Sequence, residues 1–155
     1  MTEPWTKDRG LEVIRAHQHI EAATLPILHA LQDAFGCVPE EAIPLIADAL
    51  NISRAEVHGV ISFYHEFRSK PPGRHVLKLC RAEACQAMGG DILATAAEAK
   101  LSVHFGETSP DGAVTLEPVY CLGLCACAPS ALLDGKPLGR LDRERLERII
   151  EGAAR

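Results

Sequence analysis

The sequence has few aromatic residues and no long apolar run. Aromatic side chains make up 5% of the 155 residues, so a core must consist mainly of Leu, Ile, Val and Ala. No apolar stretch approaches the roughly 18 residues of a membrane span, and no apolar segment follows the polar N-terminus as it does in a secretory signal. These absences predict a cytoplasmic protein without a membrane partner.

A surplus of positive charge is also lacking. The chain has 16 Lys and Arg against 21 Asp and Glu, a net charge of −5. Neither half is basic: seven basic residues face ten acidic ones up to residue 75, and nine face eleven after it. Because nucleic-acid-binding domains normally show a basic patch, nucleic acid is not an expected partner.

The residue type that stands out is cysteine. The six cysteines are Cys37, Cys80, Cys85, Cys121, Cys125 and Cys127. In a chain predicted to be cytoplasmic, stable disulfides are rare, and clustered cysteines more often bind metal or perform redox chemistry.

Helical periodicity dominates the first half of the chain. Helices are predicted over residues 22–35, 40–50 and 53–64. Ser53 and Glu56 have the spacing of a capping box at the start of the third helix. The run Pro71-Pro72-Gly73 ends this region and predicts a boundary there. The sequence thus predicts a helical lobe over residues 1–73 and a second domain over residues 74–155.

The second half alternates between strand-like and helix-like segments. Strands are predicted over residues 76–79, 103–108, 114–118, 131–133 and 138–141. An Ala-rich helix is expected within residues 85–100, after the break at Gly89-Gly90, and a last helix follows its cap at Asp142. This order predicts an α/β fold with one mixed sheet.

Four of the cysteines form two close pairs, and each pair follows a predicted strand. Cys80 and Cys85 are spaced C-x4-C, and Cys121 and Cys125 are spaced C-x3-C. If the two strands are neighbours, the loops converge and supply four thiolates for a tetrahedral zinc ion or an iron–sulfur cluster. Spans longer than the C-x2-C of zinc knuckles, in loops rich in Ala and Gly, favour a [2Fe–2S] cluster. A zinc-stabilised binding module without a redox role stays open as an alternative.

The remaining two cysteines are predicted not to be ligands. Cys127 is expected to be a small buried residue after the metal loop. It could instead form an alternative ligand pair or a redox dithiol with Cys125, as in a thioredoxin-like dithiol enzyme. Cys37, at a turn between helices, is expected to be a structural free thiol.

Several linked motifs carry a family resemblance. In order, they are Leu25-Pro26-x-Leu28, Gly36-x-x-Pro39, the segment from Val57 to Phe67 (VHGVISFYHEF), Pro72-Gly73, Cys80-x4-Cys85 and Cys121-Leu-Gly-x-Cys125-x-x-Ala128-Pro129. Together they resemble the 24 kDa-type [2Fe–2S] subunit of respiratory complex I and its relatives over roughly residues 22–152. The resemblance implies a thioredoxin-like [2Fe–2S] domain preceded by a small helical bundle. It also implies one [2Fe–2S] cluster with four ligands: Cys80, Cys85, Cys121 and Cys125.

The stretch from Cys80 to Gly90 (CRAEACQAMGG) looks most like the gamma subunit of soluble, molybdenum-dependent, NAD-dependent formate dehydrogenases. That resemblance implies a non-catalytic electron-transfer subunit of an oxidoreductase. Its expected partners are a flavin- and NAD-binding beta subunit and a catalytic alpha subunit with molybdenum and iron–sulfur centres. The equivalent subunit of complex I or of an NAD-reducing hydrogenase is the alternative. The chain has no G-x-G-x-x-G fingerprint after a strand, so it is not expected to bind the dinucleotide itself.

Overall fold

The computed structural model describes residues 3–154, and the chain divides into two compact units, Met1–Pro71 and Pro72–Arg155. Each unit has its own apolar core. Across the described residues, no helix is both long enough and apolar enough to cross a membrane.

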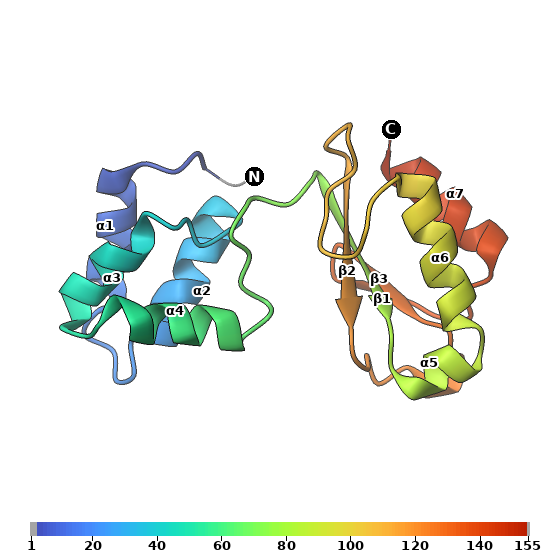
Figure 1. Ribbon diagram of the computed structural model, residues 1–155, viewed down its shortest axis with the longest axis horizontal. Coiled ribbons are helices and arrows are strands. Elements are labelled where there is room, and N and C mark those ends of the chain that lie inside the picture. Colours follow the sequence, from blue (N-terminus) through green and yellow to red (C-terminus); the bar gives the residue numbers. More distant parts are fainter. Residues whose placement is uncertain (1–2, 155) are drawn as a thin grey trace. The chain divides into compact units, whose positions relative to one another are not determined.

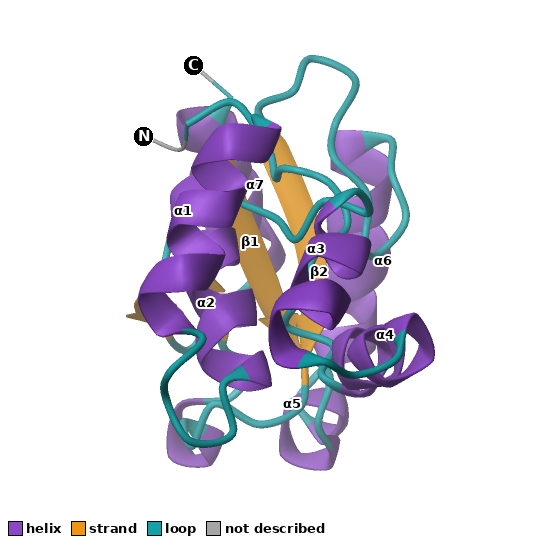
Figure 2. Cartoon of the chain, turned by 90° about the vertical axis from the view of Figure 1, so that its left-hand side faces the viewer, coloured by secondary structure: helices purple, strands orange, loops and turns teal. Residues whose placement is uncertain are grey.

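The first unit is helical (Figure 2). Its described residues form α1 (Lys7–His17), α2 (Thr24–Phe35), α3 (Ala42–Leu50) and α4 (Arg54–Phe63). Leu28, Leu31 and Phe35 of α2 are buried, in keeping with the helical spacing of these apolar positions. They pack with buried residues of the other helices, among them Ile14, Ile46 and Val57.

Local signals set the ends of these helices, and the capping box of α4 is the one that the sequence predicts. Ser53 accepts a hydrogen bond from the Glu56 backbone N–H, and the Glu56 carboxylate accepts one from the Ser53 N–H, which completes the capping box. Gly36 ends α2 in the left-handed conformation, at φ 78°.

The second unit is a four-stranded mixed sheet with helices packed against it (Figure 1). Its elements are β1 (His75–Cys80), α5 (Glu83–Ala87), α6 (Gly90–Leu101), β2 (Val114–Val119), the short 3-10 helix η1 (Cys125–Cys127), β3 (Ala131–Leu133), β4 (Lys136–Leu138) and α7 (Arg143–Ala153). The strand order is β2-β1-β3-β4. β1 and β2 are parallel, whereas β3 is antiparallel to both β1 and β4.

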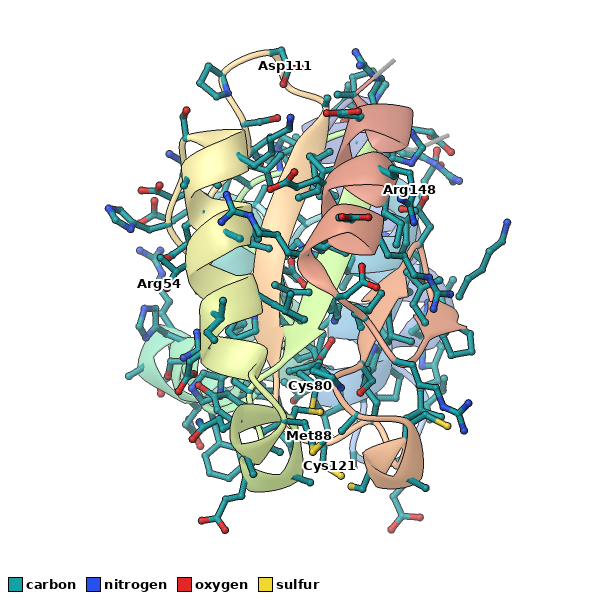
Figure 3. The ribbon with its side chains drawn as sticks, turned by 90° about the vertical axis from the view of Figure 1, so that its right-hand side faces the viewer. Arg54, Cys80, Met88, Asp111, Cys121 and Arg148 are labelled. Carbon is teal, nitrogen blue, oxygen red and sulfur yellow. The ribbon has the colours of Figure 1, made fainter. Side chains whose placement is uncertain are left out.

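Helices α6 and α7 lie side by side against the sheet (Figure 3). Leu93 of α6 and Leu146 of α7 join Leu77 and Leu116 of the sheet in one core. The Asp142 side chain caps α7 by accepting the Arg145 N–H at 2.7 Å. The predicted α/β fold with one mixed sheet is confirmed.

Two strand predictions are wrong in detail. Residues 103–108 form no regular strand and make a single bridge, from Thr108 to Thr115. The physical reason is a turn at Gly106, whose φ of 91° interrupts the extended run. The strand expected over 138–141 lies earlier, at Lys136–Leu138, because Asp134 and Gly135 both take positive φ and close a two-residue hairpin.

Candidate metal centre

Both cysteine pairs lie at one end of the sheet. Cys80 is the last residue of β1, and in the parallel register it stands opposite Val119, the last residue of β2. Since the carboxyl ends of neighbouring parallel strands meet at one edge, the loops that follow them are neighbours too. Figure 3 shows Cys80 and Cys121 at this end of the sheet.

The first pair is buried. Cys80 is 4% exposed and Cys85, in α5, is 1% exposed. The chain between them is fixed by two backbone hydrogen bonds, from Arg81 N–H to the Val119 carbonyl and from Cys85 N–H to the Ala82 carbonyl.

The second pair is exposed. The Sγ atoms of Cys121 and Cys125 lie 3.8 Å apart. With a metal–sulfur bond of about 2.3 Å, two thiolates on one tetrahedral ion also lie about 3.8 Å apart. Cys121 has a φ of 78°, and the Gly123 N–H donates to its Sγ at 3.4 Å. This loop therefore already holds two sulfurs at the separation that one metal ion requires.

The surroundings of the Cys80 sulfur lower the pKa of its thiol. Burial by itself raises the pKa of this thiol, but the backbone N–H groups of Ala82, Cys121 and Leu122 and the Cys85 side chain donate to the sulfur and hold its pKa below the usual value. Two of those N–H groups belong to the second loop. The site thus favours a thiolate at Cys80, as metal ligation requires.

The pKa of the Cys125 thiol is raised, in contrast to that of Cys80. Its hydrogen bond to Cys121 and the charge of that sulfur raise the pKa of the Cys125 thiol, and the charges of Cys85 and Cys80 add to the effect. Metal sites often bring together several thiolates that repel one another, and the bound cation offsets this repulsion.

The donor set fits a two-iron cluster. Within residues 3–154, no three His, Cys, Asp or Glu side chains converge closely enough to hold a single ion. The cysteines form two pairs at one end of the sheet, and a [2Fe–2S] cluster takes four cysteine thiolates. Backbone N–H groups directed at the sulfurs are the donors that tune such clusters.

The other two cysteines belong to neither pair. Cys127, at the end of η1, is half-buried and not fully buried as predicted, because η1 has no buried residue. Its carbonyl accepts the Arg140 N–H at 2.6 Å. It packs so closely on Gly139 that a Cβ there would meet the Cys127 Cβ at 2.8 Å. Cys37 belongs to the first unit, where burial, followed by the charge of Glu41, raises the pKa of its thiol.

Two residues of the site have no clear signal in the sequence. Ser130 is 3% exposed, and its Oγ lies 3.5 Å from the Cys85 Sγ. Gly90 predicted only a helix break, but a Cβ at this position would lie 2.6 Å from the Cys85 carbonyl oxygen. The first contact joins distant parts of the chain and the second depends on how closely α5 and α6 meet, and spacing along the chain indicates neither.

A mixed sheet with four thiols beyond the ends of two parallel strands defines a thioredoxin-like metalloprotein. The chain belongs to the thioredoxin-like [2Fe-2S] ferredoxin family, which it matches over residues 11–154. Its cofactor is accordingly one [2Fe–2S] cluster. This result favours the cluster over the zinc and dithiol alternatives.

Similar proteins include components of two kinds of oxidoreductase. The chain is 36% identical to an NADH-quinone oxidoreductase subunit of Escherichia coli over 130 residues, which cover 84% of this chain and 78% of that protein. It is 31% identical to the NADP-reducing hydrogenase subunit HndA of Solidesulfovibrio fructosivorans, with 84% and 76% covered.

A solved structure shows the same architecture. It is that of an NAD+-reducing [NiFe]-hydrogenase in the air-oxidized state, with 28% identity and a TM-score of 0.67. The match covers 81% of this chain and 22% of that chain, so the chain spans about a fifth of that much longer protein.

Proposed function

We propose that this chain is an electron-transfer subunit whose [2Fe–2S] cluster is held by Cys80, Cys85, Cys121 and Cys125. The observation that carries the proposal is the parallel pairing of β1 with β2, which sets Cys80 opposite Val119 and so brings both cysteine loops to one end of the sheet. When bound, the cluster accepts and releases one electron at a time.

Hydrogen bonding and burial affect the two cysteine pairs differently. The Gly123 N–H donates to the Cys121 sulfur and offsets its negative charge, and the surroundings of Cys80 lower the pKa of its thiol. Burial of Cys80 and Cys85 keeps water from one side of the site, whereas Cys121 and Cys125 are exposed. A neighbouring subunit would therefore exchange electrons across the Cys121–Cys125 side.

The charges nearby support a low reduction potential. Arg81 follows Cys80 directly, but its guanidinium is paired with Asp91 at 2.9 Å and lies over the Phe105 ring. No Lys or Arg lies within residues 121–127. Because Asp91 compensates the charge of Arg81, little positive charge stabilises the reduced cluster. The resulting low reduction potential suits electron exchange with a reduced flavin.

The proposed parent complex is a soluble NAD-dependent formate dehydrogenase, which converts formate and NAD+ to CO2 and NADH. In this proposal the chain adjoins a flavin- and NAD-binding beta subunit, and a molybdenum- and iron–sulfur-containing alpha subunit oxidises formate. The support is the stretch CRAEACQAMGG from Cys80 to Gly90. The second candidate is the equivalent subunit of complex I or of an NAD-reducing hydrogenase, favoured by the names of the similar proteins.

Anaerobic purification of the complex through an affinity tag on this chain tests the proposal. A formate dehydrogenase predicts that molybdenum copurifies and that formate reduces the [2Fe–2S] centre, seen as a rhombic EPR signal. Copurification of nickel with reduction by hydrogen would assign the chain to a hydrogenase instead. A chain that carries no iron and sulfide would overturn the electron-transfer function itself.

A further inference from the structure

Ser130 occupies a fixed position beside the buried cysteine pair. It lies between Pro129 and the first residue of β3, and it is 3% exposed. Its carbonyl accepts the Cys80 N–H at 3.0 Å, so the backbone of Ser130 is tied to the end of β1. The backbone bond fixes the position of Ser130, and burial restricts the directions that its side chain can take.

The Ser130 hydroxyl is directed at a second cysteine. Its Oγ lies 3.5 Å from the Cys85 Sγ, and both side chains are buried. Between a thiol and a hydroxyl, either group can donate the proton. A metal-bound cysteine is a thiolate without a proton, so in the cluster-bound protein the hydroxyl must be the donor.

We propose that Ser130 is a positioning residue that sets the cluster's reduction potential by donating an O–H···S hydrogen bond to Cys85. This inference rests on the proposed function, because it requires Cys85 to be a cluster ligand. The reduced cluster carries one more negative charge than the oxidised cluster. A donor to a ligand sulfur therefore stabilises the reduced state more, and it does so strongly where water is excluded.

Removal of the hydroxyl should therefore make the cluster harder to reduce. We expect Ser130→Ala to lower the ratio of reduced to oxidised cluster three- to tenfold at a fixed applied potential. Tenfold corresponds to a midpoint about 59 mV more negative for one electron. The four cysteines are untouched, so iron and sulfide content should stay at the wild-type level.

The matched control is Ser109→Ala. Ser109 is also buried, at 7% exposed, and its hydroxyl bonds Asp111 and the Val114 N–H in the turn before β2. Its loss should leave the potential unchanged. A second comparison uses Ser130→Thr and Ser130→Val. These two side chains have nearly the same shape, but Val has a methyl group where Thr has the hydroxyl.

The experiment is an EPR-monitored redox titration of the full-length, cluster-loaded protein. The proposal predicts a more negative midpoint for Ser130→Ala than for the wild type and Ser109→Ala, and a more negative midpoint for Ser130→Val than for Ser130→Thr. If Ser130→Ala loses the cluster, the Thr and Val pair decides, and cluster loss in the Val variant alone also supports the proposal.

Equal midpoints in the wild type and Ser130→Ala, or in the Thr and Val variants, would overturn the role of Ser130 and leave the cluster assignment intact. A wild-type protein with no [2Fe–2S] signal would instead overturn the proposed function. The two failures are therefore distinguishable.

Discussion

Replacement of Gly90 by Ala should displace Cys85 and cost the protein both stability and iron. A Cβ at residue 90 would lie 2.6 Å from the Cys85 carbonyl oxygen and 2.9 Å from its carbonyl carbon. Ordinary carbon contacts are about 3.5–4.0 Å. The atoms in the way are backbone atoms, so no side-chain rotation relieves the overlap and α5 must move.

The magnitude follows from the cost of overpacking. Extra methyl groups in tightly packed sites destabilise by about 1–3 kcal/mol, and contact with rigid backbone places Gly90→Ala near the upper end. Two nearby comparisons separate the possible causes. Gly89 has a φ of 89° but open space around it, so Gly89→Ala should cost about 1–2 kcal/mol by backbone strain alone.

The control without steric overlap is Gly152→Ala in α7, where a Cβ meets nothing within 4 Å. It should stabilise the protein by about 0.5–1 kcal/mol through helix propensity. The assay is urea unfolding followed by circular dichroism, together with iron per chain after anaerobic purification. Only Gly90→Ala should lose iron, and wild-type stability with full iron in that variant would refute the close approach of Gly90 to Cys85.

Three further changes test other parts of the structure. Cys127→Ser should leave iron, sulfide and the EPR spectrum unchanged, and a lost or altered signal would show that Cys127 is a ligand. Asp134 accepts hydrogen bonds from His75 Nδ1 at 2.7 Å and from the Val76 N–H at 2.9 Å. Burial tends to raise the pKa of this carboxyl, but these donors hold it below its usual value. Its ionised form therefore stabilises the fold at neutral pH, and Asp134→Ala should cost about 1–2 kcal/mol at pH 7. That difference should narrow as the pH falls below the unfolded value of about 3.9, so a pH-independent difference in urea unfolding would contradict the assignment. Ser53→Ala removes the cap of α4 and should cost about 1 kcal/mol in thermal unfolding, and an unchanged melting temperature would count against the capping box.

Local signals in the sequence predicted much of the fold. The pairing of Ser53 with Glu56, and the Asp142 cap, each depend on residues three positions apart, so they are visible in the sequence. The same reasoning failed for residues 103–108. Their apolar pattern resembles a strand, but the turn at Gly106 and pairing of β2 with β1 leave the segment with one bridge.

The site was predictable in outline for a similar reason. Each cysteine pair follows a strand, so parallel pairing of β1 with β2 was enough to bring the loops together. The contacts of Ser130 and Gly90 with Cys85 could not be predicted. Ser130 and Cys85 are far apart along the chain, and the contact of Gly90 with Cys85 depends on how closely α5 and α6 meet. Only the packed structure shows either contact.

The most direct test of the account is an iron, sulfide and EPR comparison of single Cys→Ser variants of the full chain, purified anaerobically. We predict two irons and two sulfides per wild-type chain, with a rhombic signal that appears only on reduction. Replacement of Cys80, Cys85, Cys121 or Cys125 should each abolish or alter that signal, whereas Cys37→Ser should retain it. A wild-type-like cluster in any of the four ligand variants would contradict the assignment.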